Sequence, residues 1–177
     1  HPLGDIAAFL RLARAARESH GSVKLLEDTD GDGRMDRMSP WADDLPPCYG
    51  LVPARDGVIV FCAPDIVYLG DRDGDGRPEI RETLFTGFGV GEMWTRISNP
   101  QWGVDNWIYG ACGEGSDGTI RGPQLANPVH LGRTGFRFKA DGSQFELVSG
   151  GTAGFGLALD DWDERFLVTN QEHALHV

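Results

Sequence analysis

Two acidic segments with the same order of residues constrain this chain most: DTDGDGRMD at residues 28–36 and DRDGDGRPE at residues 71–79. Each has carboxylates at its first, third, fifth and ninth positions and glycines at its fourth and sixth. Glycine tolerates the positive φ angles of a tight reversal, so the carboxylates can converge on one point. Carboxylate and carbonyl oxygens in this arrangement are ligands of Ca²⁺. The sequence therefore predicts two calcium sites.

Most of the predicted ligands are side-chain carboxylates, and each loop adds the backbone carbonyl of its seventh residue. An EF-hand also places a bidentate glutamate at position twelve, where the second segment has Glu82 and the first has Ser39. The alternative is that Asp and Gly cluster here only because they favour tight turns, although the repetition favours a metal. The ligand set is Asp28, Asp30, Asp32, Arg34 and Asp36 in the first site, and Asp71, Asp73, Asp75, Arg77, Glu79 and Glu82 in the second.

Short strand-like segments separated by turn residues recur along the chain. Three hairpins begin at Gly50, Gln101 and Gly156, and residues 136–150 form a fourth. The first three each have an apolar strand, a turn rich in Asp, Asn or Gly, and a second strand rich in Val, Ile, Phe or Tyr. Their second strands recur at roughly 50 to 60 residues, near the size of a four-stranded propeller blade with an insertion. We expect an all-β fold, a partial β-propeller of about three blades, with the calcium loops between strands.

The start of the chain departs from this pattern. The segment DIAAFLRLARAARESH has apolar side chains at helical spacing, with Asp5 as a candidate N-cap and Gly21 as a candidate stop. We expect residues 1–21 to form a helical segment and residues 22–177 to form one incomplete propeller domain. Because the chain begins with His1, we expect it to be part of a longer protein.

Composition excludes some classes of function. The chain has 177 residues and a formal net charge of −11, so its surface repels nucleic acid and anionic membranes. No stretch is apolar for long enough to form a transmembrane helix, and the first residues do not resemble a signal peptide. We therefore expect no nucleic-acid partner and no transmembrane segment in this chain.

The order of several motifs resembles a known family. LEDTDGDGRMDR, CAPDIVYLGDRDGDGRPEIRETLFTGFG, QWGVDNWIYGACG, FRFKADGSQFELVSGG and DDWDERFLVTNQEHALHV follow one another over about the last 155 residues. In this order they resemble the N-terminal domain of the membrane-bound dehydrogenases of planctomycetes and verrucomicrobia, also described as haem-binding CxxCH proteins. The resemblance implies a propeller related to soluble glucose and sorbosone dehydrogenases, export to the periplasm or cell surface, and pyrroloquinoline quinone as a cofactor. It also implies a sugar or polyol substrate and a downstream cytochrome c domain carrying haem c.

Quinone-dependent oxidation needs a general base, usually histidine, and a cationic group that stabilises developing charge. His173 and Arg96 are the candidates in this chain, with His176, His130 and Arg133 as further nominees.

Two other functions stay open at this stage. A noncatalytic, calcium-stabilised propeller could bind a carbohydrate or a protein. Its tryptophans could stack on sugar rings, although packing between blades is the reading that we favour for them. A glycoside-processing enzyme would instead use paired carboxylates, for which Glu92, Glu114 and Asp117 are the candidates. The aromatic residues in question are Trp94, Trp102, Trp107, Tyr109 and Trp162.

Overall fold

The structure is a computed structural model that describes residues 21–149, 156–169 and 175–176. Apart from two short 3₁₀ turns, η1 (Met93–Thr95) and η2 (Glu114–Ser116), all regular structure in these residues is β. The all-β expectation is therefore confirmed. The helix expected near the start of the chain lies outside the described residues. Within the described part, no helix is long and apolar enough to cross a membrane.

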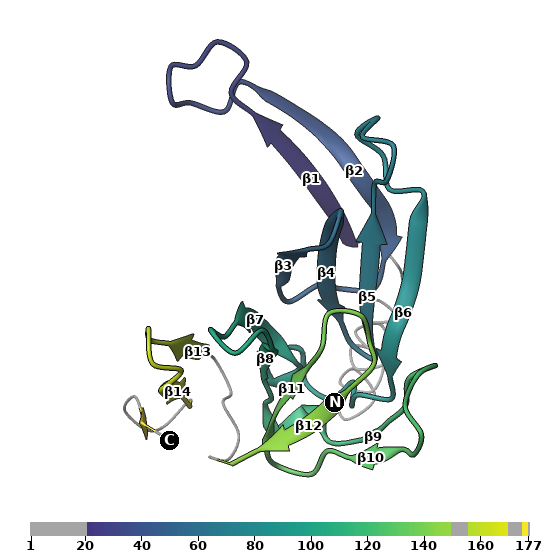
Figure 1. The fold of residues 1–177 in the computed structure, drawn as a ribbon, viewed down its shortest axis with the longest axis vertical. Coiled ribbons are helices and arrows are strands. Elements are labelled where there is room, and N and C mark those ends of the chain that lie inside the picture. The colour runs from purple at the N-terminus through teal and green to yellow at the C-terminus, as the bar shows by residue number, and fades with distance from the viewer. Residues whose placement is uncertain (1–20, 150–155, 170–174, 177) are drawn as a thin grey trace, which may run out of the picture. The chain divides into compact units, whose positions relative to one another are not determined.

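The chain divides into two compact units, His1–Cys48 and Tyr49–Val177. The first unit contains an antiparallel hairpin of β1 (Gly21–Glu27) and β2 (Arg37–Leu45), drawn in Figure 1. At the end of the hairpin that carries the first acidic loop, Glu27 pairs with Arg37 across the two strands. Their side chains also form an ion pair, at 3.4 Å. The loop is thus held between two paired strand ends.

The second unit is built from consecutive antiparallel strands (Figure 1). The first sheet contains β3 (Leu51–Ala54), β4 (Gly57–Cys62), β5 (Asp65–Gly70) and β6 (Ile80–Thr86). The second contains β7 (Ser98–Trp102), β8 (Ile108–Ala111), β11 (Gly135–Phe138) and β12 (Phe145–Val148). The third contains β13 (Gly156–Leu159), β14 (Arg165–Val168) and β15 (Leu175–His176). The short pair β9 (Thr119–Ile120) and β10 (Val129–His130) lies in the connection between β8 and β11.

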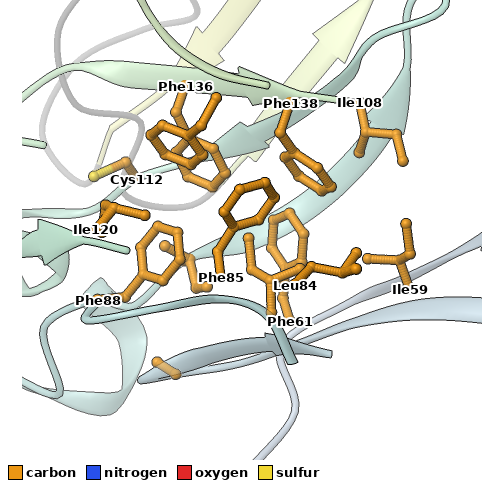
Figure 2. Close-up of a cluster of buried hydrophobic side chains, with 14 of the residues drawn as sticks. Ile59, Phe61, Leu84, Phe85, Phe88, Ile108, Cys112, Ile120, Phe136 and Phe138 are labelled. Carbon is orange, nitrogen blue, oxygen red and sulfur yellow. The ribbon is translucent and has the colours of Figure 1, made fainter. Parts of the chain in front are cut away.

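An aromatic core fills the space between the first two sheets (Figure 2). Phe61 and Phe85 come from the first sheet, Phe136 and Phe138 come from the second, and all four are fully buried. The rings of Phe61 and Phe136 are stacked with their centroids 5.9 Å apart. Gly110 on β8 makes this approach possible, because a Cβ there would lie 2.4 Å from the Phe136 ring.

A second apolar cluster joins the second sheet to the third. It contains Tyr109 and Ala111 from β8, together with Leu157 and Leu167 from β13 and β14. Successive side chains of a strand point to opposite faces, so β8 contributes Ile108 to the aromatic core and its neighbours to this cluster. Because β8 is buried on both faces, it lies between two apolar layers.

The first strands of the three sheets are neighbours. The indole Nε1–H of Trp102 on β7 donates to the carbonyl of Pro53 on β3, at 2.8 Å. On its other side, β7 reaches β13 through Gln101, whose side-chain amide donates to the carbonyl of Leu157 at 2.7 Å. The same amide accepts the N–H of Leu159 at 3.2 Å. The sheets are therefore linked in chain order through β3, β7 and β13.

Candidate metal centres

The two acidic segments occupy equivalent positions in two hairpins. Residues 28–36 connect β1 to β2, and residues 71–79 connect β5 to β6. Each begins directly after one strand and ends directly before the next, so each is a nine-residue hairpin loop. The expectation that the loops lie between strands is confirmed, and neither has the flanking helices of an EF-hand.

The first aspartate organises each loop from within. The Asp28 carboxylate accepts the N–H groups of Gly31 and Gly33, at 2.7 and 2.8 Å. In the second loop, the Asp71 carboxylate accepts the N–H groups of Gly74 and Gly76, at 2.8 and 2.9 Å. The same two hydrogen bonds therefore form at the same positions in both loops.

The third and fifth positions also match. Asp30 accepts the N–H of the residue two positions later at 3.2 Å, and Asp73 does so at 3.1 Å. Asp32 and Asp75 do the same, each at 2.8 Å. These bonds use one oxygen of each carboxylate and set its direction relative to the loop.

The glycines of both loops adopt left-handed backbone angles. In the first loop Gly31 and Gly33 have φ of 79° and 87°, and in the second Gly74 and Gly76 have φ of 75° and 85°. A Cβ at any of these positions would have no atom within 4 Å. Glycine is therefore required here for its backbone angle and not for space.

The ninth residue closes each loop against its second residue. In the first loop Asp36 accepts the N–H of Thr29 at 3.1 Å, and in the second Glu79 accepts the N–H of Arg72 at 2.8 Å. The loops differ in one respect, because the hydroxyl of Thr29 also lies 2.9 and 2.8 Å from the two oxygens of Asp36. Arg72 has no hydroxyl to make this contact.

Three acidic side chains come together in each loop. Asp28, Asp30 and Asp32 form one group and Asp71, Asp73 and Glu79 form the other, with their ligand oxygens within 4.8 Å of one another. Oxygens that share one Ca²⁺ at 2.3–2.6 Å lie within about 5 Å of each other. The spacing in each group is therefore compatible with one shared Ca²⁺, and each group has one half-buried and two exposed members.

Hydrogen bonding favours the charged form of the first and ninth carboxylates of the first loop, Asp28 and Asp36. The N–H groups of Gly33 and Gly31 lower the pKa of Asp28 below its usual value of 3.8. The hydroxyl and N–H of Thr29 similarly lower the pKa of Asp36. Calcium binds the deprotonated carboxylate, so these hydrogen bonds favour the form of Asp28 and Asp36 that can act as a ligand.

Not every predicted ligand joins these groups. Asp36 and Asp75 lie outside them, and the backbones of Arg34 and Arg77 run through the loops at the seventh position. Glu82 lies on β6, where its carboxylate pairs with Arg55 at 3.5 Å. Of the two glutamates predicted as ligands of the second site, Glu79 at position nine therefore joins the acidic group and Glu82 does not.

With this geometry established, comparison with known proteins places the chain in a family. The model of the family described as Domain of unknown function (DUF7133) matches residues 7–177. The chain belongs to the DUF7133 family. No curated protein and no solved structure matched it.

In this DUF7133 domain one of the two leading catalytic candidates, Arg96, lies in the described residues. Arg96 is 3% exposed and donates to the carbonyls of Gly91 and Val90, at 3.2 and 3.3 Å. Its third contact is the hydroxyl of Tyr49, at 3.4 Å. Arg96 thus pins the segment before β7 to the start of β3, while His173 lies outside the described residues.

The other nominated groups of the DUF7133 domain have local partners. His130 lies 3.8 Å from Asp117, whose carboxylate also accepts the N–H of Gly132 at 3.0 Å. Arg133 pairs with Glu114. His176 lies 3.2 Å from Glu164. These contacts join neighbouring turns, and none brings a histidine beside Arg96.

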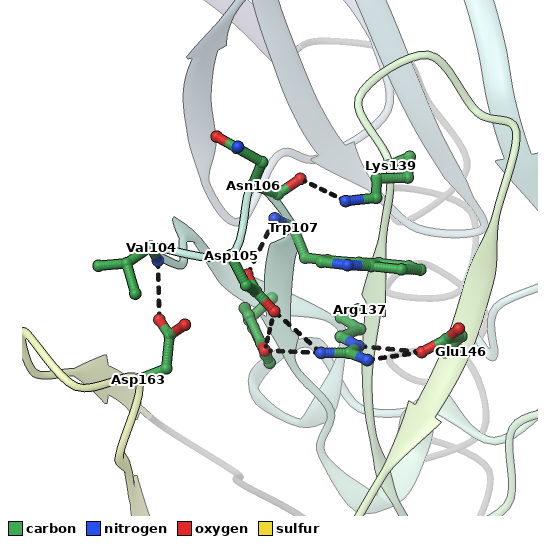
Figure 3. A network of polar contacts seen from close by, with 9 residues as sticks. Val104, Asp105, Asn106, Trp107, Arg137, Lys139, Glu146 and Asp163 are labelled. Atoms are coloured by element: carbon green, nitrogen blue, oxygen red, sulfur yellow. Dashed lines mark hydrogen bonds and ion pairs between the residues drawn. The ribbon is translucent and has the colours of Figure 1, made fainter.

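A polar cluster that the sequence did not predict surrounds Arg137 (Figure 3). Its guanidinium donates to Asp105 at 2.9 Å and to Glu146 at 2.8 and 3.0 Å. It also lies over the ring of Trp107, 4.4 Å from the centroid, and the ammonium of Lys139 lies 4.2 Å from the same centroid. Figure 3 shows the two cations on opposite sides of the indole. The motif WGVDNW is the part of the sequence that could have indicated this cluster, since its aspartate and second tryptophan both belong to it.

Proposed function

We propose that this DUF7133 chain is a calcium-stabilised β-module in which each acidic loop holds one Ca²⁺. The observation that carries the proposal is the repetition of one loop design. Residues 28–36 and 71–79 have the same length, the same strand connections, the same left-handed glycines and the same carboxylate hydrogen bonds. Carboxylates recur at the first, third, fifth and ninth positions of both loops, which are positions that supply oxygen ligands to Ca²⁺ in loops of this kind.

Terbium luminescence tests this proposal directly, because Tb³⁺ occupies calcium sites and is excited by nearby aromatic residues. We expect a signal that calcium displaces at two equivalents per chain. The double variant Asp30→Asn/Asp73→Asn retains side-chain acceptors for both turns while removing one charged ligand from each site. Loss of the displaceable signal in this variant supports the proposal, and an unchanged signal contradicts it.

We also propose that the three sheets are successive blades of a larger β-propeller. The support is their order, since each sheet consists of antiparallel strands that follow one another along the chain. Successive sheets also pack against each other through apolar clusters. Their first strands are neighbours, as the inner strands of propeller blades are. Small-angle scattering of the full-length parent protein would test this, because a closed propeller gives the profile of a disc.

For the parent protein we propose a quinone- or haem-linked dehydrogenase acting on sugars or related alcohols at the periplasm or cell surface. The support is the ordered set of motifs and not a site in the described residues. Pyrroloquinoline quinone carries several carboxylates and needs several available cations. The nominated Arg96 and Arg133 do not supply them, because the first is buried against carbonyls and the second pairs with Glu114. Dye-linked oxidation of sugars by the full-length protein, with and without added quinone, tests the proposal.

A further inference from the structure

The turn between β13 and β14 exposes a tryptophan to an unusual degree. Trp162 is 79% exposed, whereas tryptophan is on average one of the more buried residues. The same turn, Asp160–Glu164, contains four carboxylates on the two sides of this ring. An exposed aromatic ring flanked by carboxylates offers both a cation–π contact and an ion pair to a cationic group.

Hydrogen bonds hold the backbone of the turn that carries Trp162. The carboxylate of Asp160 accepts the N–H groups of Trp162 and Glu164, both at 2.9 Å. Asp163 adopts a left-handed φ of 61°, and its N–H donates to the carbonyl of Asp160 at 3.2 Å. Because the backbone is fixed by these bonds, docking on the indole costs little ordering of the turn.

A second turn extends this surface. The carboxylate of Asp163 accepts the N–H of Val104, from the turn between β7 and β8, at 2.8 Å (Figure 3). Val104 is 69% exposed. The acidic turn therefore lies beside an apolar side chain that could pack against the methylene groups of a long cationic residue.

The two turns share a local motif, but only the first has a cation stacked on its tryptophan in the described residues. In both, an aspartate accepts the N–H of a tryptophan two residues later: Asp105 with Trp107 at 3.0 Å, and Asp160 with Trp162 at 2.9 Å. In the first turn, Arg137 stacks on the tryptophan and pairs with the aspartate. No cation in the described residues stacks on Trp162.

The chain near Trp162 supplies little positive charge. Arg165 donates to the carbonyl of Ser149 at 2.5 Å. His176 contacts Glu164 at 3.2 Å, and residues 166–177 contain no Lys or Arg. The negative charge of the turn is thus largely uncompensated within the described residues.

We propose that this two-turn surface, formed by Asp160–Glu164 and Val104, docks an arginine-bearing polypeptide segment of a partner. An arginine from the partner would stack on Trp162 and pair with a carboxylate, as Arg137 does with Trp107 and Asp105. A second copy of this surface would bring like charges together, and a neutral sugar would leave the negative charge of the turn uncompensated. Charge complementarity therefore selects a cationic polypeptide.

Calorimetric titration of the chain with a hexa-arginine peptide, in calcium-containing buffer, tests this proposal. We expect Trp162→Ala to weaken binding by about fivefold or more, from the loss of a cation–π contact, and Asp161→Asn to weaken it by about threefold. Matched controls are Trp94→Ala, which removes an exposed tryptophan on η1, and Asp44→Asn, which removes an exposed carboxylate on β2. Both should change affinity by less than about twofold.

Indole NMR signals of the same samples identify the ring that responds. The proposal requires the peptide to shift the Trp162 signal. Equal affinities of Trp162→Ala, Asp161→Asn and the unaltered chain would overturn it. A Trp162 signal that responds to cellohexaose but not to hexa-arginine would also overturn it, as would self-association that disappears in Trp162→Ala.

Discussion

The hydroxyl of Thr29 lies 2.9 and 2.8 Å from the two carboxylate oxygens of Asp36, and this contact closes the first acidic loop. The pKa of Asp36 is lowered mainly by this hydroxyl, with the Thr29 N–H contributing next. A lowered pKa in the folded state stabilises the fold above the unfolded value of about 3.8, and this stability is lost as the pH falls through the folded pKa.

We therefore predict that Thr29→Val raises the pKa of Asp36 toward 3.8. This pKa is measured from the NMR shift of the carboxylate carbon, followed from neutral to acidic pH in the presence of chelator. Asp28 serves as the internal control, since its lowered pKa depends on Gly33 and Gly31. Equal changes at both residues would show that the substitution disturbs the whole loop.

Substitutions of the third-position aspartates distinguish stabilisation by the bound ion from stabilisation by the turn itself. We predict that Asp30→Ala and Asp73→Ala lower stability in calcium but matter little in chelator, because each makes one weak turn hydrogen bond at 3.2 or 3.1 Å. At calcium one hundred times the dissociation constant, losing a site costs about 2.7 kcal/mol. Thermal unfolding in calcium and in chelator gives the comparison. Equal losses in both conditions would mean that these aspartates act only as turn residues.

Gly110 leaves room for two phenylalanine rings to pack against β8 in the aromatic core. A Cβ at this position would lie 2.4 Å from Phe136 and 2.8 Å from Phe61. We predict that Gly110→Ala destabilises the fold by about 1–3 kcal/mol through overpacking. Gly156→Ala is the matched control, because its Cβ would meet nothing closer than 3.6 Å.

A double variant tests whether the cost at Gly110 comes from the ring. Adding Phe136→Leu to Gly110→Ala should recover part of the loss, giving a coupling of at least about 0.5 kcal/mol in urea unfolding. Strict additivity of the two substitutions would count against the proposed contact.

Arg137 joins two carboxylates and an indole through one planar group. Burial alone would lower the pKa of Arg137, but the hydrogen bonds to Glu146 and Tyr109 raise it above its usual value. Lysine cannot reproduce this fork of donors. We predict that Arg137→Lys costs about 1–3 kcal/mol in urea unfolding, whereas the exposed Arg133→Lys costs less than about 1 kcal/mol. Similar costs for both would contradict a special role for Arg137.

Local patterns in the sequence were sufficient for most of the strands. The hairpins beginning at Gly50, Gln101 and Gly156 form, as does the hairpin within residues 136–150, because alternation and turn chemistry are local properties. Strand β2 was not expected, since Pro40, Asp43 and Asp44 are poor strand formers. Pairing with β1 overrides their propensity.

Contacts between segments that are distant in the sequence could not be predicted from local patterns. The acidic loops were found because most of their ligands lie within nine residues. The Asp105 partner of Arg137 lies in the turn between β7 and β8, in a different hairpin from Arg137 on β11. The boundary expected at residues 21 and 22 was based on helical spacing and on Gly21 as a stop, and the expected helix lies outside the described residues. The compact units divide between Cys48 and Tyr49. The burial of Arg96 likewise depends on a segment 47 residues away in the chain.

The central claim is that the two acidic loops bind calcium and stabilise the fold. The thermal unfolding midpoint of the purified chain, measured over a series of calcium concentrations with magnesium and chelator as controls, tests it most directly. We predict a midpoint that rises steadily with calcium, as mass action requires for a ligand of the native state, and that rises much less with magnesium. A midpoint that does not respond to calcium would contradict the account and leave both loops as turns.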